Sequence, residues 1–280
     1  MSSTELIDFH IHVGDVSAMR ADIRELVIGM AGRRDFDLPR LFSSPPDLLA
    51  YLKEEGVTRG VLIADEGPGV NFAPTTDFVC DFRDAVDPEG TFFTVLGNIN
   101  PNRSPNIMAK HESDAKRGIA GYKLYPADHD FHPISDELMT FYKQLENEGK
   151  ILMFHTGTTG QEDGVDELGE PMLFKPILDA CPNLTVVMAH AGKPKWCDQA
   201  IEFVQTYPNC YVDTAFMKPE MILTYLPNLA EIADKVLFGS DWPVGVRSLS
   251  GHVQQIRDLG LDDKVLDKIF ARNAARLLGL

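Results

Sequence analysis

The sequence lacks any long apolar run. Among its 280 residues, no stretch approaches the roughly 18 consecutive apolar positions that a membrane-spanning helix requires. The first residues also lack the basic and then apolar pattern of a secretory signal. We therefore expect no membrane partner.

Cysteine is scarce as well. The four cysteines, Cys80, Cys181, Cys197 and Cys210, are far apart and form no Cys-x-x-Cys motif. This spacing argues against a disulfide framework and is typical of reduced, buried thiols. The localisation that it predicts is cytoplasmic.

Positive charge is in short supply. The chain has 26 lysines and arginines against 42 aspartates and glutamates, which gives a net charge of −16. Such a surface repels the phosphates of nucleic acids and anionic lipids, so we expect neither as a partner. The partner that we expect is a small molecule, and the sequence leaves open whether the chain forms a homo-oligomer.

The chain has no low-complexity segment and no Gly/Ser-rich linker, so nothing divides residues 1–280 into two domains. Instead, short β-rich runs alternate with amphipathic helical patterns. Eight strands are expected, at 5–12, 58–64, 91–98, 118–124, 150–156, 184–190, 209–213 and 234–240. Helical patterns lie at 46–55, 75–86, 105–117, 136–148, 171–180, 196–207, 219–232 and, in two pieces, 250–278.

Strands that alternate with helices imply parallel strand pairing. Eight such units predict a single-domain α/β protein with a (β/α)8 TIM barrel. A doubly wound open sheet is the alternative, but that fold usually has a glycine-rich first turn. Here residues 8–14 read DFHIHVG instead, so we favour the barrel.

Polar residues end six of the eight expected strands. They are His10 and His12 on the first strand, then Lys123, His155, His190, Asp213 and Asp241 on the fourth to eighth. The carboxyl ends of barrel strands meet at one mouth, where barrel enzymes carry their chemistry. Burying four imidazoles there without a counter-charge would be costly, whereas a divalent metal uses imidazoles and carboxylates as ligands. The pattern therefore predicts a metal site at the mouth.

The order of these motifs resembles that of the amidohydrolase superfamily. Within it, the chain is similar to the amidohydrolase-related family that includes aminocarboxymuconate semialdehyde decarboxylase, resorcylate decarboxylases and several lactone hydrolases. The resemblance runs from DFHIH through GYKLYP, MFHTG, MAHAG and FGSDWP to the closing RNAARLLGL, and so covers nearly the whole chain. It implies a metal-dependent hydrolase or decarboxylase.

Carried over by position, the resemblance implies that His10, His12, His155 and Asp241 are the metal ligands. The two catalytic residues would be His190, which bonds the metal-bound water or the reacting group, and Asp241, either of which would handle the proton. We expect one zinc ion, with manganese as the alternative. Strand alternation would place Asp8 on the same face, as a supporting group beneath the site.

Lys123 occupies roughly the place where members with two metals carry a carboxylated lysine. Decarboxylase-like members commonly use one metal and no such lysine. We favour one metal, with Lys123 as a substrate-binding or supporting cation. Tyr125, Trp242 and Arg247 are the other residues that we expect to bind substrate.

The leading interpretation is hydrolysis of a lactone or amide by a metal-activated water. The alternative enzyme class is non-oxidative decarboxylation of a small aromatic or unsaturated acid. A third hypothesis is a barrel that binds a metal or ligand without turnover. It is disfavoured because such a protein would not need His190.

Residues 14–44 follow the first strand and are expected to form a lid across the mouth. The basic residues of this segment are all arginines: Arg20, Arg24, Arg33, Arg34 and Arg40. The guanidinium group suits bidentate binding of carboxylates. We therefore expect at least one arginine to reach the pocket and the substrate to be a small carboxylated ring compound or lactone. For each single arginine, the alternative is an ion pair on the surface.

The other four histidines are expected to stay outside the site. They are His111, His129, His132 and His252, and polar neighbours or loop positions predict that each is exposed to solvent. For His129 and His132, which follow the fourth strand, the alternative is that they face the mouth.

Overall fold

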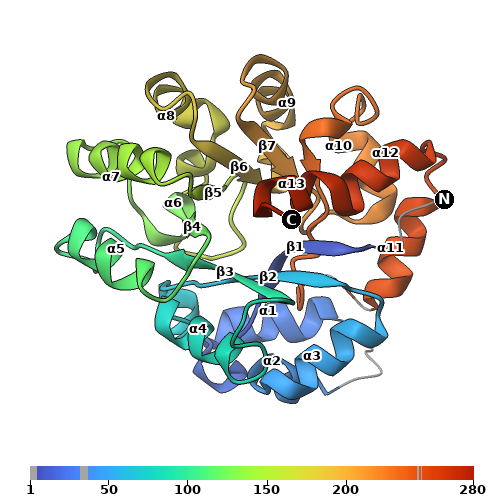
Figure 1. The fold of residues 1–280 in the computed structure, drawn as a ribbon, viewed down its shortest axis with the longest axis horizontal. Helices are drawn as coiled ribbons and strands as arrows, with labels where there is room; N and C mark the ends of the chain where they lie inside the picture. The colour runs from blue at the N-terminus through green and yellow to red at the C-terminus, as the bar shows by residue number, and fades with distance from the viewer. Residues whose placement is uncertain (1–4, 32–36, 245, 247) are drawn as a thin grey trace.

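The computed structural model describes residues 5–31, 37–244, 246 and 248–280. Eight parallel strands follow one another around a nearly closed barrel in the order of the chain (Figure 1). They are β1 (Ile7–His12), β2 (Arg59–Ile63), β3 (Phe93–Asn98), β4 (Gly121–Leu124), β5 (Ile151–His155), β6 (Thr185–Ala189), β7 (Cys210–Asp213) and β8 (Val236–Leu237). The predicted single-domain TIM barrel is confirmed.

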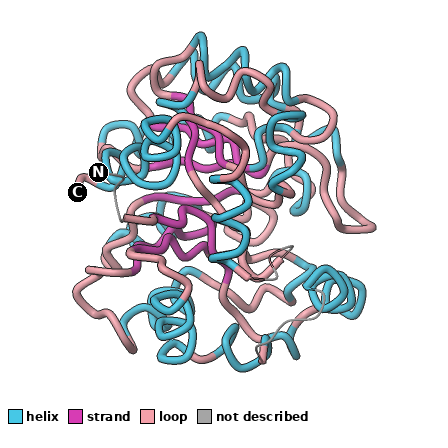
Figure 2. Tube along the Cα trace, turned by 90° about the vertical axis from the view of Figure 1, so that its right-hand side faces the viewer, coloured by secondary structure: helices cyan, strands magenta, loops and turns pink. Residues whose placement is uncertain are grey.

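The helices surround the strands on the outside of the barrel (Figure 2). They are α1 (Ala21–Ala31), α2 (Leu38–Ser43), α3 (Pro45–Glu54), α4 (Thr76–Asp84), α5 (Ile107–Ala115), α6 (Pro126–His129), α7 (Asp136–Asn147), α8 (Lys175–Ala180), α9 (Cys197–Thr206), α10 (Ile222–Tyr225), α11 (Leu249–Arg257), α12 (Asp263–Asp267), the π-helix η8 (Lys268–Arg272) and α13 (Asn273–Leu278). Several begin at residues that the sequence offers as caps, since the side chains of Thr75, Asn106 and Ser135 accept bonds from backbone amides three positions on. Among the described residues, no helix has both the length and the apolar character needed to cross a membrane.

The apolar core has two parts. An outer cluster packs between strands and helices and includes Leu62, Tyr122 and Phe154. A smaller inner cluster fills the barrel itself and includes Phe9 and Val187. Helix α13 packs against this inner cluster and lies over the centre of the ring of strands in Figure 1. The inner cluster and α13 therefore close one end of the barrel, and the polar residues gather at the other.

The first and last strands close the barrel through a short seam. The amide of Phe9 donates to the carbonyl of Phe238 at 2.9 Å, and the amide of Asp241 donates to the carbonyl of His10 at 3.0 Å. We call these contacts the β1–β8 seam. His10 and Asp241, two of the predicted site residues, therefore lie where the first strand meets the segment of the last strand.

Strand β1 does not alternate regularly. The pairing of β1 with β2 shifts register between Asp8 and Ile11, and Ile11 packs in the outer cluster while Phe9 packs in the inner one. The expectation that Asp8 lies on one face with His10 and His12 is therefore too simple. Asp8 Oδ1 accepts from the backbone amides of His10 at 3.2 Å and Ser240 at 2.9 Å, so Asp8 supports the backbone rather than an imidazole.

The helix predicted over 219–232 is wrong in its second half. A 3-10 turn (Pro219–Met221) and the short α10 are followed by non-helical chain. Pro227 explains the end, because the residue before a proline avoids the α-helical region and proline has no amide to continue the helix. Elsewhere the helical predictions agree with the structure to within a few residues, and the segment 14–44 contains α1 and α2.

Candidate metal centre

The histidines of the first strand meet the aspartate that follows β8. His10 Nε2 and His12 Nε2 each lie 3.2 Å from Asp241 Oδ1. His10 is fully buried, and one fifth of the His12 side chain is exposed. Gly239 permits this approach, since a Cβ there would lie 2.8 Å from His10 Cβ. The chain thus brings three of the four predicted ligands together.

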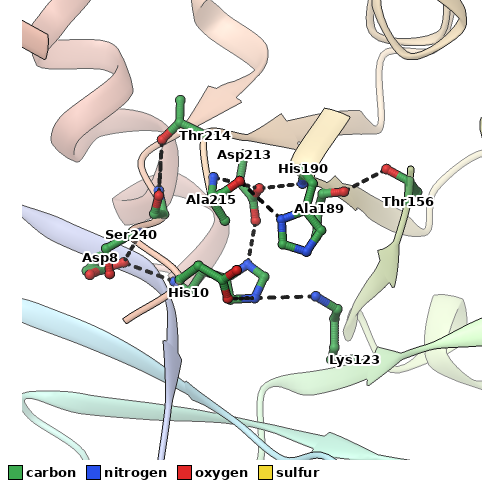
Figure 3. A network of polar contacts seen from close by, with 12 residues as sticks. Asp8, His10, Lys123, Thr156, Ala189, His190, Asp213, Thr214, Ala215 and Ser240 are labelled. Atoms are coloured by element: carbon green, nitrogen blue, oxygen red, sulfur yellow. Dashed lines mark hydrogen bonds and ion pairs between the residues drawn. The ribbon is translucent and has the colours of Figure 1, made fainter. Parts of the chain in front are cut away.

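Asp213, at the end of β7, orients His10 (Figure 3). Its Oδ2 accepts from His10 Nδ1 at 2.8 Å, so Nε2 is left without a proton and faces the centre. Its Oδ1 accepts from the backbone amides of His190 at 2.7 Å and Ala215 at 3.1 Å. One carboxylate therefore fixes a ring and a backbone segment of the centre. The sequence analysis predicts that Asp213 lies at the mouth of the barrel but assigns it no function.

His190 lies beside His10, with 5.1 Å between ring centroids. Its Nδ1 lies 3.1 Å from the carbonyl of Ala215 and must donate to it, which leaves Nε2 as an acceptor. His190 and Asp241 both have backbone φ in the left-handed region, at 66° and 60°. Such strained positions in residues other than glycine are concentrated at functional sites.

The donor atoms of this centre fit a metal ion. Among the described residues, His10, His190 and Asp241 each offer one ligand atom, and these atoms lie within 4.8 Å of one another. His155, the fourth predicted ligand, is turned differently. Its ring centroid is 4.8 Å from that of His190, but its Nε2 lies 3.4 Å from the Thr158 carbonyl and its Nδ1 lies 3.6 Å from an Asp128 oxygen.

The protonation states also fit. Burial lowers the pKa of His10 and of His190 well below the ordinary value, so both imidazoles are neutral, as metal ligands must be. Burial would raise the pKa of the Asp241 carboxyl, but His10, His12 and Lys123 outweigh it and hold that pKa below its usual range. The centre therefore presents neutral nitrogens beside an ionised carboxylate.

Lys123 is fully buried under the centre, with its Nζ 3.4 Å from His10 Nε2 (Figure 3). Burial lowers the pKa of its ammonium, and four carboxylates oppose that effect. They are Asp213, Asp241, Asp128 and Asp65. Lys123 is thus a cation surrounded by acids rather than an isolated surface charge.

Two of these acids were missed in the sequence. Asp65 follows β2, and its Oδ1 lies 3.0 Å from His129 Nε2. Asp128 lies in α6 after β4, beside His155, and bonds the hydroxyl of Thr159. The rule that site residues follow barrel strands could have found Asp65, but Asp128 depends on a one-turn helix that no periodicity reveals.

The structure places the other predicted substrate-binding residues in different surroundings. The Tyr125 hydroxyl donates to the Ala64 carbonyl at 3.0 Å. Trp242 is fully buried in the outer cluster, with its ring 6.3 Å from that of Phe42 and 6.0 Å from that of Tyr51. Trp242 therefore packs in the apolar core rather than at a substrate-binding surface. Arg247 lies outside the described residues.

Two arginines of the segment 14–44, Arg20 and Arg40, form surface ion pairs. Arg20 binds Asp22 and Asp163, each with nitrogen–oxygen distances of 2.8 Å. Arg40 binds Asp47 at 2.6 Å, and two thirds of the Arg40 side chain is exposed. Arg33 and Arg34 lie outside the described residues. Arg20 and Arg40 thus follow the ion-pair alternative.

Three of the four remaining histidines contradict the expectation of exposure. His111 is buried between the Tyr122 hydroxyl at 3.0 Å and a Glu148 oxygen at 3.1 Å. His129 and His252 are also buried, and only His132 is exposed. For His111, polar neighbours along the helix misled the prediction, because an amphipathic helix buries one face whatever its sequence neighbours are.

A cavity of about 680 Å³ opens beside the centre. Ser240, which precedes Asp241, lines it, and so does Phe216, whose ring lies 6.5 Å from that of His190. Its other walls come from the segments after β6, β7 and β8, and they include Lys193, Met217, Tyr225 and Val244. A pocket of this size suits a small molecule.

Comparisons with known proteins agree with this geometry. A family model described as Amidohydrolase matches residues 7–280. No curated protein matches the sequence. An uncharacterized TIM-barrel protein from Bordetella bronchiseptica is 21% identical, with a TM-score of 0.81 and 98% of each chain covered.

Two further solved structures have related folds. One is a probable 2-pyrone-4,6-dicarboxylic acid hydrolase from Acinetobacter baumannii with citric acid bound, 14% identical, with a TM-score of 0.69 and coverage of 99% of this chain and 100% of that chain. The other is 5-carboxyvanillate decarboxylase from Novosphingobium aromaticivorans, complexed with manganese and 4-hydroxy-3-methoxy-5-nitrobenzoic acid. It is 14% identical, with a TM-score of 0.68 and coverage of 99% of this chain and 96% of that chain. At these identities the likeness shows the shared barrel.

Proposed function

The chain belongs to the amidohydrolase family of metal-dependent hydrolases and decarboxylases, and from this premise we propose that it hydrolyses a lactone or amide bond in a small, anionic ring compound. The observation that carries the proposal is the pairing of neutral His10 and His190 with ionised Asp241. A divalent ion held there would polarise the substrate carbonyl and lower the pKa of a water molecule.

The protein groups would position that water and move its proton. Asp241 Oδ1 faces the Nε2 atoms of His10 and His12, so the second carboxylate oxygen is the atom proposed to take the proton. His190 Nε2, fixed as an acceptor by the bond from Nδ1 to Ala215, would hydrogen-bond the attacking water or the reacting group. Asp213 and the buried walls would keep these groups in place.

We propose one ion rather than two. Four carboxylates act on the Lys123 ammonium, those of Asp65, Asp128, Asp213 and Asp241. A carboxylated Lys123 would add a further negative charge beside those four acids, so we propose that Lys123 stays an ammonium. Zinc is the proposed metal, manganese is the alternative, and the proposed compartment is the cytoplasm.

Elemental analysis of the purified protein tests this proposal. We expect about one zinc or manganese ion per chain, since three to four side-chain ligands surround one position. Two ions per chain with a carboxylated Lys123 would overturn the single-ion proposal alone. Full activity of metal-free protein would overturn the proposed function.

Two assignments of the metal ligands are possible, and the metal content of variants distinguishes them. The family pattern gives His10, His12, His155 and Asp241 as the ligands, with His190 on the reacting group, and we adopt it. The geometry supports the rival version in which His190 is a ligand. His155→Ala should therefore lose more metal than His190→Ala under the same dialysis. The reverse order would assign the ligand role to His190.

Asp241→Asn tests the proton-transfer role. The amide cannot take up a proton, so kcat should fall by about 10² to 10⁴. Turnover is measured on protein whose metal content has been matched to that of the parent. Near-parental kcat in Asp241→Asn would remove the aspartate from this role.

Decarboxylation is the second candidate function. It is favoured by the structural likeness to 5-carboxyvanillate decarboxylase, which holds manganese and an aromatic acid. The same centre could bind a substrate carboxylate beside a second oxygen and deliver a proton to carbon. Product analysis separates the two reactions, since release of CO2 marks decarboxylation and opening of a ring or amide marks hydrolysis.

A further inference from the structure

The cavity beside the centre has an apolar wall and a few polar groups. Its apolar side chains include Phe216, Met217, Met221 and Val244, from the segments that follow β7 and β8. Ser240 joins this wall to the metal centre, because Asp241 is the next residue. A flat, ring-sized molecule can therefore occupy the cavity while one end reaches the centre.

Lys193 and Lys218 are the two lysines that line this cavity, and Lys193 is the half-buried one. Its Nζ lies 4.0 Å from the centroid of the Phe216 ring. Among the described residues, no carboxylate lies within ion-pair distance of Lys193, whereas Lys195, two positions on, binds Asp166 at 2.7 Å. Burial lowers the pKa of Lys193 to about 8. It is a cation with an aromatic neighbour and no acidic partner at ion-pair distance.

The backbone holds Lys193 firmly in this place. Its carbonyl accepts from the amide of Thr158 at 3.1 Å, and its own amide donates to the carbonyl of His190 at 3.1 Å. Gly157 approaches so closely that a Cβ there would lie 2.1 Å from the Lys193 carbonyl oxygen. The loops after β5 and β6 are thus clamped together at Lys193. A clamped loop presents the ammonium at low conformational cost.

We propose that the cavity holds the ring of the substrate and that Lys193 binds an anionic group on that ring. The assignment of the cavity to substrate rests on the proposed function. Lys193 therefore takes the anion-binding role that the sequence suggested for the arginines of the segment 14–44. The ligands that fit are flat apolar acids, because the Lys193 ammonium would offset the repulsion from the acidic chain.

The test uses two probes of nearly the same shape, the anion 2-naphthoate and its neutral analogue 2-naphthamide. Dissociation constants are measured by calorimetry on the full-length protein as isolated. Lys193→Met should weaken binding of 2-naphthoate by about tenfold, which is about 1.4 kcal/mol, and leave 2-naphthamide within about twofold. Lys193→Arg should restore the preference for the acid, because it restores the cation.

Two other lysines serve as matched controls. Lys195→Met removes a charge from the same loop, and Lys218→Met removes an exposed charge from the cavity rim. Both variants should bind the two probes as the parent does. If Lys218→Met but not Lys193→Met lost the preference for 2-naphthoate over 2-naphthamide, the proposal would be overturned. It would also be overturned if the parent bound neither probe.

The outcome is independent of the reaction. The titrations are repeated after chelation, so a carboxylate that binds the metal contributes nothing, and the difference between Lys193→Met and Lys195→Met should persist. Disappearance of that difference on chelation would overturn the role of Lys193 and leave the hydrolase proposal untouched. Once a substrate is known, Lys193→Met should raise KM for the anionic substrate with little change in kcat. A loss in kcat with unchanged KM would instead make Lys193 a proton donor and overturn the binding role.

Discussion

At the scale of single residues, the orientation of His10 depends on Asp213. The carboxylate accepts from Nδ1 at 2.8 Å, and both groups are fully buried. In Asp213→Asn, the amide can turn its NH2 group to the ring and favour the wrong tautomer, with the proton on Nε2. Removal of such a supporting partner typically costs 10- to 100-fold in metal affinity. We expect a loss of about tenfold or more, measured by competition with a chelator.

The chain offers a matched control for this prediction. Glu148 contacts the buried His111 at 3.1 Å, away from the metal centre. Glu148→Gln makes the same chemical change and should leave metal affinity unchanged, although it lowers stability. If Asp213→Asn bound metal as tightly as Glu148→Gln, Asp213 would have no special role in orienting His10.

His252 makes stability depend on pH. It is buried, its Nε2 has no hydrogen-bond partner within the described chain, and burial lowers its pKa from 6.5 to about 4. The folded protein therefore binds this proton more weakly than the unfolded chain does. Above about pH 6.5, neutral His252 costs the folded protein no stability. As the pH falls toward about 4, the unfolding free energy decreases, and the loss due to His252 reaches about 3 kcal/mol.

His252→Leu removes this proton linkage. From about pH 7 to about pH 4.5, the parent should lose about 2 kcal/mol more unfolding free energy than the variant. Urea unfolding of chelated protein at both pH values measures the difference, because chelation removes the pH dependence of metal binding. Parallel losses in the two proteins would show that His252 is not the group responsible.

At the scale of elements, the sequence predicts the strands well for a physical reason. Each strand is a short β-rich run between turn signals, and parallel pairing forces the strand ends to one mouth. His10, His12, His190 and Asp241 meet there because each follows such a run. The ends of strands are thus visible in the sequence, whereas which of the residues there would hold the metal stays a prediction.

The loops are less visible. Asp128 reaches the centre from a one-turn helix, Lys193 lines the cavity from a clamped loop, and neither has a periodic signal. The shifted register of β1 turns Asp8 away from the face that alternation predicts. Contacts between distant segments decide which arginines form ion pairs on the surface. Such contacts also bury Trp242. A single sequence does not encode these contacts in any local pattern.

The clamp between the loops after β5 and β6 gives a prediction about glycine. Gly157 has φ of 96°, and a Cβ there would lie 2.1 Å from the Lys193 carbonyl oxygen. Gly157→Ala should therefore lower the unfolding free energy by about 2 kcal/mol or more, since backbone atoms must shift and the φ is unfavourable. It should also weaken binding of 2-naphthoate, because Lys193 moves.

Gly29 is the control for that change. It lies exposed within α1, and a Cβ there would meet nothing within 4 Å. Gly29→Ala should raise the unfolding free energy by up to about 1 kcal/mol, through helix propensity. Urea unfolding measures the unfolding free energy of both variants. If Gly157→Ala were as stable as the parent and bound 2-naphthoate as the parent does, the loops would not be clamped at Lys193.

At the scale of the whole molecule, the metal centre lies on the closure of the barrel. Among the described residues, β8 has only two residues in its strand, and the β1–β8 seam continues through the segment that carries Asp241. The amide of His12 donates to the Trp242 carbonyl at 2.8 Å in the same region. Ligands from the two ends of the chain would therefore hold one ion, and the ion would join the first strand to the last.

Metal binding should accordingly stabilise the seam more than the rest of the barrel. At a free metal concentration about 100 times Kd, binding to the folded state alone adds about 2.7 kcal/mol. For a chain of this size, that gain corresponds to a rise in Tm of about 5 °C. Hydrogen exchange locates the effect. The amides of Phe9, His12 and Asp241 should exchange more slowly with metal, while those of β4 and β5, across the barrel, should change less. Equal protection of both sides, or a rise in Tm that persists in Asp241→Ala, would mean that the ion does not close the barrel.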